Sequence, residues 1–239
     1  MCGRYDYHPK EFADLRIRWN LDRDLPLFKP RYNIAPGQQA PVAANLDGVT
    51  ACQLFQWGLV PSWAKDHSIG HTMINARAET LTEKPSFRPL LGKRHCLVLA
   101  NGFYEWRREG KQKVPMRFKL KSGEPFAFAG LWDSWKKPDG NLLLTYTIIT
   151  TEPNEVTRPI HNRMPVMLSD DDAMKWITSD GGGLTHSLSL LKPFPPELME
   201  SYEVSKLVNN PRNDSSACIQ PVAPQGPGLL FAAGTKCLT

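Results

Sequence analysis

The chain has 239 residues, enough for one large domain or two small ones with a substantial hydrophobic core. Its hydrophobic content of 41% and charged content of 22% are ordinary for a soluble globular protein. No apolar run is long enough to span a bilayer, and the first residues lack the basic and then apolar pattern of a signal peptide. These features exclude a membrane-spanning or secreted class, and we expect a soluble intracellular protein.

Five cysteines form an odd set without CxxC spacing, so neither a disulfide framework nor a zinc site is indicated. His95 and Cys96 are adjacent but have no second ligand pair at metal-site spacing. We therefore predict a reduced compartment, no bound metal and no cofactor. The net charge of +5 and the pI near 8.9 are compatible with nucleic-acid binding without being diagnostic of it. The arginines could equally form an ordinary solvated surface.

The first predicted element is a helix over Pro9–Trp19, because Pro9 suits a first helical turn and apolar residues recur on one face. The proline-rich segment Leu25–Pro41 predicts an extended, turning loop rather than regular structure. Strands are predicted over Pro41–Ala44 and Ala51–Leu59, the second ended by Pro61.

The rest of the chain alternates short apolar runs with turn residues. A short helical stretch follows Asn75–Thr80 and is interrupted at Pro85. Ser169 is the predicted N-cap of a helix that ends at Ile177. A further helix is predicted over Leu184–Leu191. The remaining predicted strands are Arg94–Ala100, Pro115–Leu120, Pro125–Trp132 and Leu142–Thr150, with turns at Lys121–Glu124 and Pro138–Asn141.

Strands that follow one another with few helices between them predict an α+β fold. We expect a single domain over residues 1–222, built on a largely antiparallel β-sheet with a few peripheral helices. The Pro- and Gly-rich residues 223–239 are predicted to form a disordered tail.

Cys2 follows the initiator methionine, and a residue this small permits removal of Met1. The new amino terminus would carry an α-amine with a pKa near 7.7–8.0 beside a thiol. An amine and a thiol on adjacent carbons can condense with an aldehyde to a five-membered thiazolidine ring. A cysteine at this position is by itself also compatible with no chemical role.

Three further stretches combine reactive side chains with turns or strand ends, where active sites gather. Asn75 could orient an amine or hydroxyl group, or merely bond to its own turn. Glu105, flanked by aromatic residues, could have a raised pKa if buried, or pair with a neighbouring arginine at the surface. His161 lies between a proline-ended loop and a strand and could transfer protons near pH 7, or be structural.

Taken together, these stretches resemble one known family. The segments MCGR, RYNIAPGQ, WGLVPSW, INARAET, ANGFYEW and IHNRMPV are similar in type, order and spacing to those of the SRAP (SOS-response-associated peptidase) family. The resemblance covers roughly Met1–Val222. It implies single-stranded DNA binding and covalent capture of abasic sites through the amino-terminal cysteine, in the response to DNA damage.

The resemblance also implies roles for individual residues. Cys2 becomes the cross-linking nucleophile, Asn75 a positioning residue, Glu105 an acid–base catalyst and His161 a second proton donor or acceptor. The residues it makes candidates for DNA contact are Arg4, Arg77 and Arg163 for phosphate, and Trp63, Phe87 and Trp106 for stacking on bases. Core packing is an alternative for each aromatic residue. Some members carry a second aromatic residue after the PSW-like tryptophan, where this chain has Ala64.

The expected partner is single-stranded DNA that contains abasic sites, bound by a monomer without membrane contact. The expected location is the cytoplasm, with the nucleoid in a bacterium or the nucleus in a eukaryote. The family name also implies self-removal of Met1 or a leader, and a lyase activity is a further expectation. Two alternatives stay open: a thiol protease that uses Cys2 with His161 as base, and a non-covalent single-strand-binding module.

Overall fold

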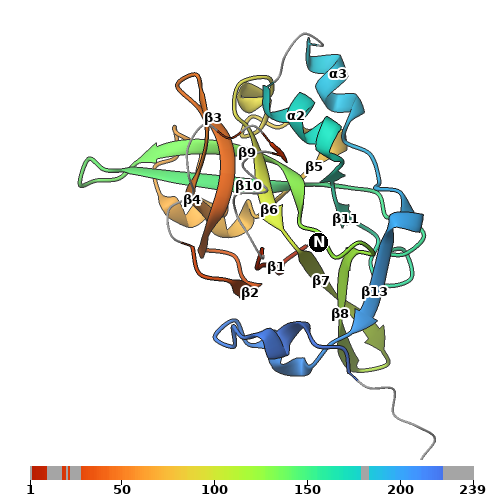
Figure 1. Ribbon diagram of the computed structural model, residues 1–239. Helices are drawn as coiled ribbons and strands as arrows, with labels where there is room; N and C mark the ends of the chain where they lie inside the picture. The colour runs from red at the N-terminus through yellow and green to blue at the C-terminus, as the bar shows by residue number, and fades with distance from the viewer. Residues whose placement is uncertain (1, 10–17, 20, 22–27, 179–182, 223–239) are drawn as a thin grey trace, which may run out of the picture.

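The polypeptide folds around two β-sheets that meet at the amino-terminal strand (Figure 1). A computed structural model describes residues 2–9, 18–19, 21, 28–178 and 183–222. Over these residues one sheet has the order β13 (Met199–Glu203), β8 (Gln112–Leu120), β7 (Gly102–Glu109), β1 (Tyr5–Tyr7) and β2 (Arg31–Ile34).

The second sheet curls into a barrel-like ring. Its order, as far as the chain is described, is β11 (Met164–Pro165), β10 (Leu142–Thr151), β4 (Val49–Trp57), β3 (Gln39–Leu46), β6 (His95–Ala100), β9 (Phe126–Lys136) and β12 (Met167–Leu168). β9 also pairs with β10, which closes the ring, and β5 (Asn75–Arg77) adds to β10. The far end of the β9–β10 hairpin projects from the body of the molecule (Figure 1).

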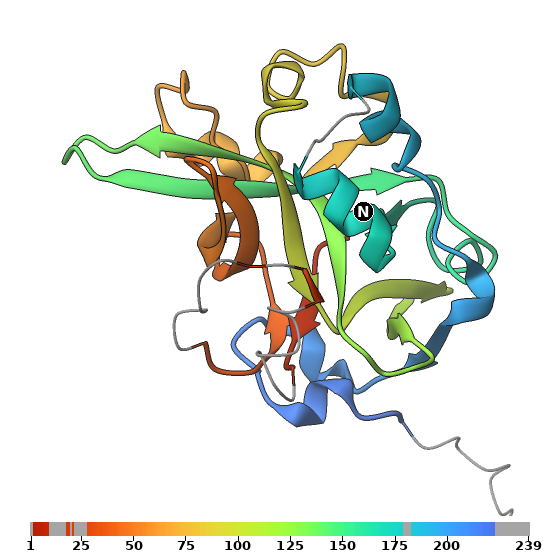
Figure 2. The same ribbon diagram turned by 45° about the horizontal axis from the view of Figure 1, so that its top comes forward.

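The hydrophobic core fills this ring. β6 is buried at every position, and β9 is buried from Phe126 to Asp133, as expected for strands covered on both faces. α2 (Asp170–Thr178) lies over β6 and β9 (Figure 2), and the Trp176 indole N–H donates to the Cys96 carbonyl at 3.1 Å. α3 (Gly183–Ser189) follows it. The short 3-10 helices are His67–Thr72, Ala78–Thr80, Arg88–Leu90, Pro196–Leu198, Lys206–Asn209 and Ser216–Ile219.

The α+β prediction of one largely antiparallel domain with few helices is confirmed. Pairings of β10 with β4 and β5 are parallel exceptions. Ser169 caps α2 as predicted, since its hydroxyl accepts the Asp172 N–H at 3.2 Å. Most of the predicted helix Pro9–Trp19 and the predicted tail 223–239 lie outside the described residues.

Two local predictions were wrong. The segment Leu25–Pro41 contains regular structure, because Arg31–Ile34 pairs with β1 despite the surrounding prolines. Glu105 lies inside β7, whereas the sequence suggested a loop at the end of a strand. Both predicted turns are present: the one at Lys121–Glu124 leads from β8 in the first sheet to β9 in the second, and the one at Pro138–Asn141 closes the β9–β10 hairpin.

Among the described residues, no helix is long and apolar enough to cross a membrane.

Candidate active site

The first strand carries Cys2 to the middle of the molecule. β1 runs antiparallel to β7, and the backbone N–H of Tyr104 donates to the Arg4 carbonyl at 3.0 Å. Continuing this register towards the amino terminus places Gly3 opposite Glu105 and Cys2 opposite Trp106, one position further along β7. The Cys2 side chain is fully buried, and its thiol donates to the Arg4 carbonyl at 3.7 Å.

Asn75 holds the backbone of Cys2 from the other sheet. It begins β5, where it lies opposite Ile148, and the Trp57 indole N–H fixes the preceding carbonyl of Ile74 at 2.8 Å. The Asn75 side-chain N–H donates to the Cys2 carbonyl at 2.8 Å. The Asn75 side-chain oxygen is buried and has no hydrogen-bond partner within the described chain. One acceptor therefore remains for a donor beside Cys2.

Glu105 is a buried carboxyl group, only 4% exposed. Burial penalises its charged form and raises its pKa to about 7. The Cys2 thiol responds to the same surroundings, since burial and then the negative charge of Glu105 raise its pKa well above the ordinary value. At neutral pH the thiol is therefore protonated, while Glu105 can both give and take a proton.

His161 is presented by a loop between β10 and β11. The buried Asn154 side chain shapes the loop by accepting the N–H groups of Val156 and Thr157, each at 3.1 Å. The His161 N–H then donates to the Thr157 carbonyl at 2.9 Å. The sequence prediction of a histidine between a loop and a strand is thus confirmed.

The His161 ring has a defined tautomer. Its Nδ1 accepts the Arg163 N–H at 3.1 Å, a shorter contact than the 3.3 Å to the Arg163 carbonyl oxygen. The neutral ring therefore carries its proton on Nε2. Partial burial and then nearby positive charges, among them Arg108 and Arg163, lower the pKa of His161, so the neutral form dominates at pH 7.

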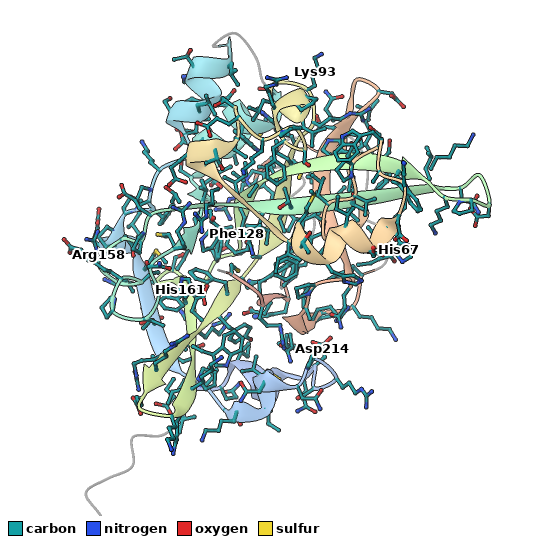
Figure 3. The ribbon with its side chains drawn as sticks, turned by 180° about the vertical axis from the view of Figure 1, so that it is seen from behind. His67, Lys93, Phe128, Arg158, His161 and Asp214 are labelled. Atoms are coloured by element: carbon teal, nitrogen blue, oxygen red, sulfur yellow. The ribbon has the colours of Figure 1, made fainter. Side chains whose placement is uncertain are left out.

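A cavity of about 400 Å³ joins Glu105 and His161. Figure 3 shows His161 on the side of the molecule opposite His67, which borders a separate cleft. The Cys2 carbonyl accepts the Asn75 side-chain N–H, and the charge of Glu105 acts on the Cys2 thiol. The structure thus links all four residues singled out from the sequence, two through the cavity and two through these interactions. The cavity is lined by Glu105, Trp106, Arg108, Lys113, His161 and Asn209.

Trp106 forms one wall of the cavity, and Arg4 lies close to its ring. Arg4 Nη1 donates to the Asn33 side-chain oxygen and to the Val208 carbonyl, both at 2.7 Å. Its guanidinium lies 6.0 Å from the centre of the Trp106 ring, whose N–H donates to Asn209 at 2.7 Å. The half-buried Arg4 side chain therefore already has hydrogen-bond partners within the protein. The Trp106 ring is held in a fixed orientation.

The other two predicted phosphate contacts differ from each other. Arg163 forms a two-fold ion pair with Glu79, at 2.7 and 2.9 Å, and also donates to the Thr150 carbonyl at 2.6 Å. Arg77 ends β5 and is exposed. Arg77 is the better placed of the two to reach a ligand, because Arg163 would first have to leave Glu79.

The predicted stacking residues also separate. Trp63 is 60% exposed on a turn held by its neighbours, since Asp133 accepts the Ser62 N–H at 2.8 Å and the Ala64 carbonyl accepts the Trp135 indole N–H at 2.7 Å. Gly58 lies at the base of this turn with φ +118°, where a Cβ would lie 2.5 Å from the Gly70 carbonyl oxygen. Phe87 instead belongs to the hydrophobic core and does not face solvent.

Sequence reasoning missed Arg108, Lys113 and Asn209. Each lies in a segment without a distinctive motif, and only the pairing of β7 with β8 brings the first two together. Within the described residues, no group of three or more His, Cys, Asp or Glu side chains is placed to hold a metal ion.

The fold and site define a two-sheet protein with a buried cysteine near its amino terminus and, close to it, a carboxyl group that shares a cavity with a histidine. The chain matches the family described as SOS response associated peptidase (SRAP) over residues 1–211. The chain therefore belongs to the SRAP family.

Relatives include both bacterial and animal proteins. The chain is 47% identical over 223 residues to "Abasic site processing protein YoqW" of Bacillus subtilis, covering 92% of this chain and 99% of that protein. It is 32% identical over 270 residues to "Abasic site processing protein HMCES" of Rattus norvegicus, covering 92% and 76% respectively. A crystal structure of a protein from Bacteroides thetaiotaomicron aligns with TM-score 0.82 at 28% identity, covering 92% of this chain and 100% of that one.

Proposed function

We propose that this protein captures abasic sites in single-stranded DNA by forming a covalent thiazolidine through Cys2, once Met1 has been removed. The observations that carry the proposal are the hydrogen bond of Asn75 to the Cys2 carbonyl and the influence of the Glu105 charge on the Cys2 thiol, beside a cavity that Glu105 and His161 both line. The names of the relatives, abasic site processing proteins, are consistent with it.

The first step is opening of the abasic sugar. The closed hemiacetal must gain a proton on its ring oxygen and lose one from its C1′ hydroxyl to give the aldehyde. The His161 Nε2–H is a donor for the ring oxygen, because Nδ1 is occupied by the Arg163 N–H. Holding the reacting groups together replaces a slow bimolecular encounter.

The second step is attack by the α-amine of Cys2 on C1′. The unpaired Asn75 side-chain oxygen can accept a hydrogen bond from this amine and direct its lone pair towards the sugar. The carbinolamine then loses water to give an imine, and a protonated Glu105 can supply the proton for the departing hydroxyl. A pKa of about 7 leaves Glu105 protonated in about half of the molecules at neutral pH.

The third step closes the ring. The Cys2 sulfur adds to C1′, the thiol proton passes to the Glu105 carboxylate, and the imine nitrogen gains a proton. The sum is aldehyde plus cysteine giving thiazolidine plus one water. Because burial keeps the thiol protonated until this step, a neighbouring proton acceptor is required, and Glu105 is the carboxylate whose charge acts on this thiol.

DNA binding is proposed to use exposed groups around the cavity. Trp63 offers a large flat surface to a base, and Arg77 offers an exposed positive charge. Trp106 can stack at the cavity wall. Arg163 could contribute only by exchanging Glu79 for a phosphate. The proposed contacts do not include Phe87, because it is buried.

The test is a denaturing gel with single-stranded oligonucleotides that differ only in having an abasic site. The wild-type protein should give a heat-stable adduct with the abasic strand alone. Cys2→Ala retains an amine but lacks the thiol, so it should give no heat-stable band and should be trapped as an imine by borohydride. Cys218→Ala, which removes another buried thiol, should behave as wild type.

A version with a blocked amino terminus separates the amine from the thiol. It should form neither the stable adduct nor the trapped imine. An adduct that survives blocking would show that the thiol alone reacts and would overturn the thiazolidine. Shortened DNA products on the same gel measure the lyase activity.

A thiol protease is the second candidate, and the geometry favours it less. A protease would need a thiolate, whereas burial and Glu105 disfavour the Cys2 thiolate. Cleavage of unrelated peptides would favour this candidate. A non-covalent module would bind DNA equally well with Cys2→Ala and give no adduct.

A further inference from the structure

Two positive side chains lie opposite each other at the edge of the catalytic cavity. Arg108 on β7 is the cross-strand partner of Lys113 on β8, and both are exposed. Like charges directly opposite on neighbouring strands are destabilising. In the described part of the chain neither head group has an ion-pair or hydrogen-bond partner. The fold therefore tolerates an unfavourable pair of charges at the site.

The adjacent arginine is neutralised. Arg107 donates to Glu109 at 2.8 Å and approaches Glu203 at 3.3 Å, so two carboxylates compensate one guanidinium. Among the described residues both acids bond to Arg107, and neither bonds to Arg108. The two neighbouring arginines therefore differ in two respects: Arg108 lines the cavity, and it has no carboxylate partner in this part of the chain.

The spacing suits a DNA backbone. Arg108 lies three residues from Glu105 along β7, about 10 Å at the rise of a β-strand. That separation spans the reach from a reacting sugar to the first or second phosphate on one side of it. A guanidinium and an ammonium together favour a phosphodiester oxygen pair over a neutral ligand.

We propose that Arg108 and Lys113 form a phosphate subsite that binds one backbone phosphate of the DNA on one side of the abasic sugar. The inference rests on the proposed function, and it assigns two residues that the motifs do not include. The bound phosphate relieves the repulsion between the two side chains and fixes the position of C1′ relative to Cys2. It also offsets the positive charge that Arg108 directs at His161.

The test measures equilibrium binding of single-stranded abasic DNA at several salt concentrations, in a Cys2→Ala background with a blocked amino terminus, which can form neither the imine nor the thiazolidine. For single strands, each neutralised phosphate contributes about 0.7 to the slope of log Kobs against log salt. The Arg108→Ala/Lys113→Ala double variant should lose about 0.7 of the slope. The matched control Arg107→Ala/Lys111→Ala removes two charges from the same hairpin and should keep the slope.

A methylphosphonate scan identifies the phosphate. Oligonucleotides with one neutral linkage at a time are compared between the background protein and the double variant. One linkage next to the abasic site should weaken binding in the background protein and have no further effect in the double variant. Equal losses of slope in both double variants, or no linkage with this coupling, would overturn the subsite. Competition by inorganic phosphate without a sensitive linkage would also overturn it.

The two proposals fail in different ways. Absence of a heat-stable adduct with the protein that retains Cys2 would contradict covalent capture, whatever the salt slopes show. An adduct that forms normally, with unchanged slope in the Arg108→Ala/Lys113→Ala variant, would contradict the phosphate subsite alone. Thermal unfolding controls for folding, and the double variant should be no less stable than the background protein because it loses a repulsive pair.

Discussion

Two buried carboxylic acids lie on neighbouring strands of the same sheet and behave in opposite ways. Asp6 on β1 is fully buried, and burial alone would raise its pKa. The charge and hydrogen bonds of Arg117, at 2.8 and 2.9 Å, outweigh burial with help from His8, so the pKa of Asp6 is lowered. Glu105 on β7 is almost as buried, and its pKa rises to about 7.

The same sheet thus contains one buried acid that is paired with an arginine and one whose pKa is set mainly by burial. The Asp6–Arg117 pair ties β1 to β8 across β7, where a Cβ on Gly102 would lie 2.9 Å from both charged groups. Because β1 leads directly to Cys2, this pair holds the reactive end of the chain. Glu105 has no such compensation from an arginine, so burial keeps it available for proton transfer.

Replacing each acid with its amide should have the larger effect on stability at Asp6. Asp6→Asn removes the negative charge and leaves Arg117 buried without its main partner. We expect a loss of about 3–5 kcal/mol in the free energy of unfolding, measured by urea denaturation. A double variant, Asp6→Asn/Arg117→Met, should be less destabilised than Asp6→Asn. If Asp6→Asn/Arg117→Met were instead less stable than Asp6→Asn, the unpaired charge of Arg117 would not be the cause of the destabilisation.

The same change at Glu105 should affect chemistry rather than folding. Glu105→Gln preserves the shape of the side chain and removes only a carboxyl group whose charged form is disfavoured by burial. We expect unfolding free energy at pH 7 to be unchanged or higher, and the rate of covalent capture to fall by about 10²-fold. Single-turnover adduct formation at saturating DNA measures that rate. Equal capture rates for Glu105→Gln and wild type would remove Glu105 from the mechanism.

The pH dependence of stability sharpens the contrast. Between its ordinary pKa of 4.5 and its raised pKa of about 7, Glu105 keeps a proton that the unfolded chain releases, so stability falls as pH rises through this window. Asp6 acts in the opposite direction, since its lowered pKa adds stability that is lost as pH falls below about 4. Glu105→Gln should remove the fall in unfolding free energy between pH 4.5 and 7, a change of up to a few kcal/mol. It should leave the loss of stability below about pH 4 unchanged. Urea midpoints across pH measure both limbs.

The sequence predicts much of this site because its chemistry is local. Cys2, Asn75, Glu105 and His161 each fall in a short, distinctive stretch, and buried strands such as Arg94–Ala100 show as apolar runs. A family pattern then implied that the four belong together. Helix α2 was equally predictable, since Ser169 and three acids mark its start.

What the sequence could not show depends on pairing between distant strands. Arg117 is an unremarkable residue of β8 until β1 is placed opposite β7, 111 positions away from Asp6 in sequence. In the sequence, Arg108 and Lys113 cannot be distinguished from the neighbouring Arg107 and Lys111. Only the pairing of β7 with β8 shows that Arg108 and Lys113 line the cavity. Phe87 and Trp63 are both aromatic in the sequence, and only folding buries one and exposes the other.

The smallest expected effect concerns His161, the third titrating group of the site. Burial lowers its pKa first, and Arg108 and Arg163 add to this, while Glu105 and Lys113 also border the cavity. Arg108→Ala should therefore raise the pKa of His161 towards its ordinary value, as measured by NMR titration of the ring. Arg107→Ala should shift it less, because Glu109 and Glu203 already offset that charge. An equal shift in both variants would mean that the pKa of His161 depends on the net charge of the protein rather than on the charges that line the cavity. Arg108 would then have no special influence on the site.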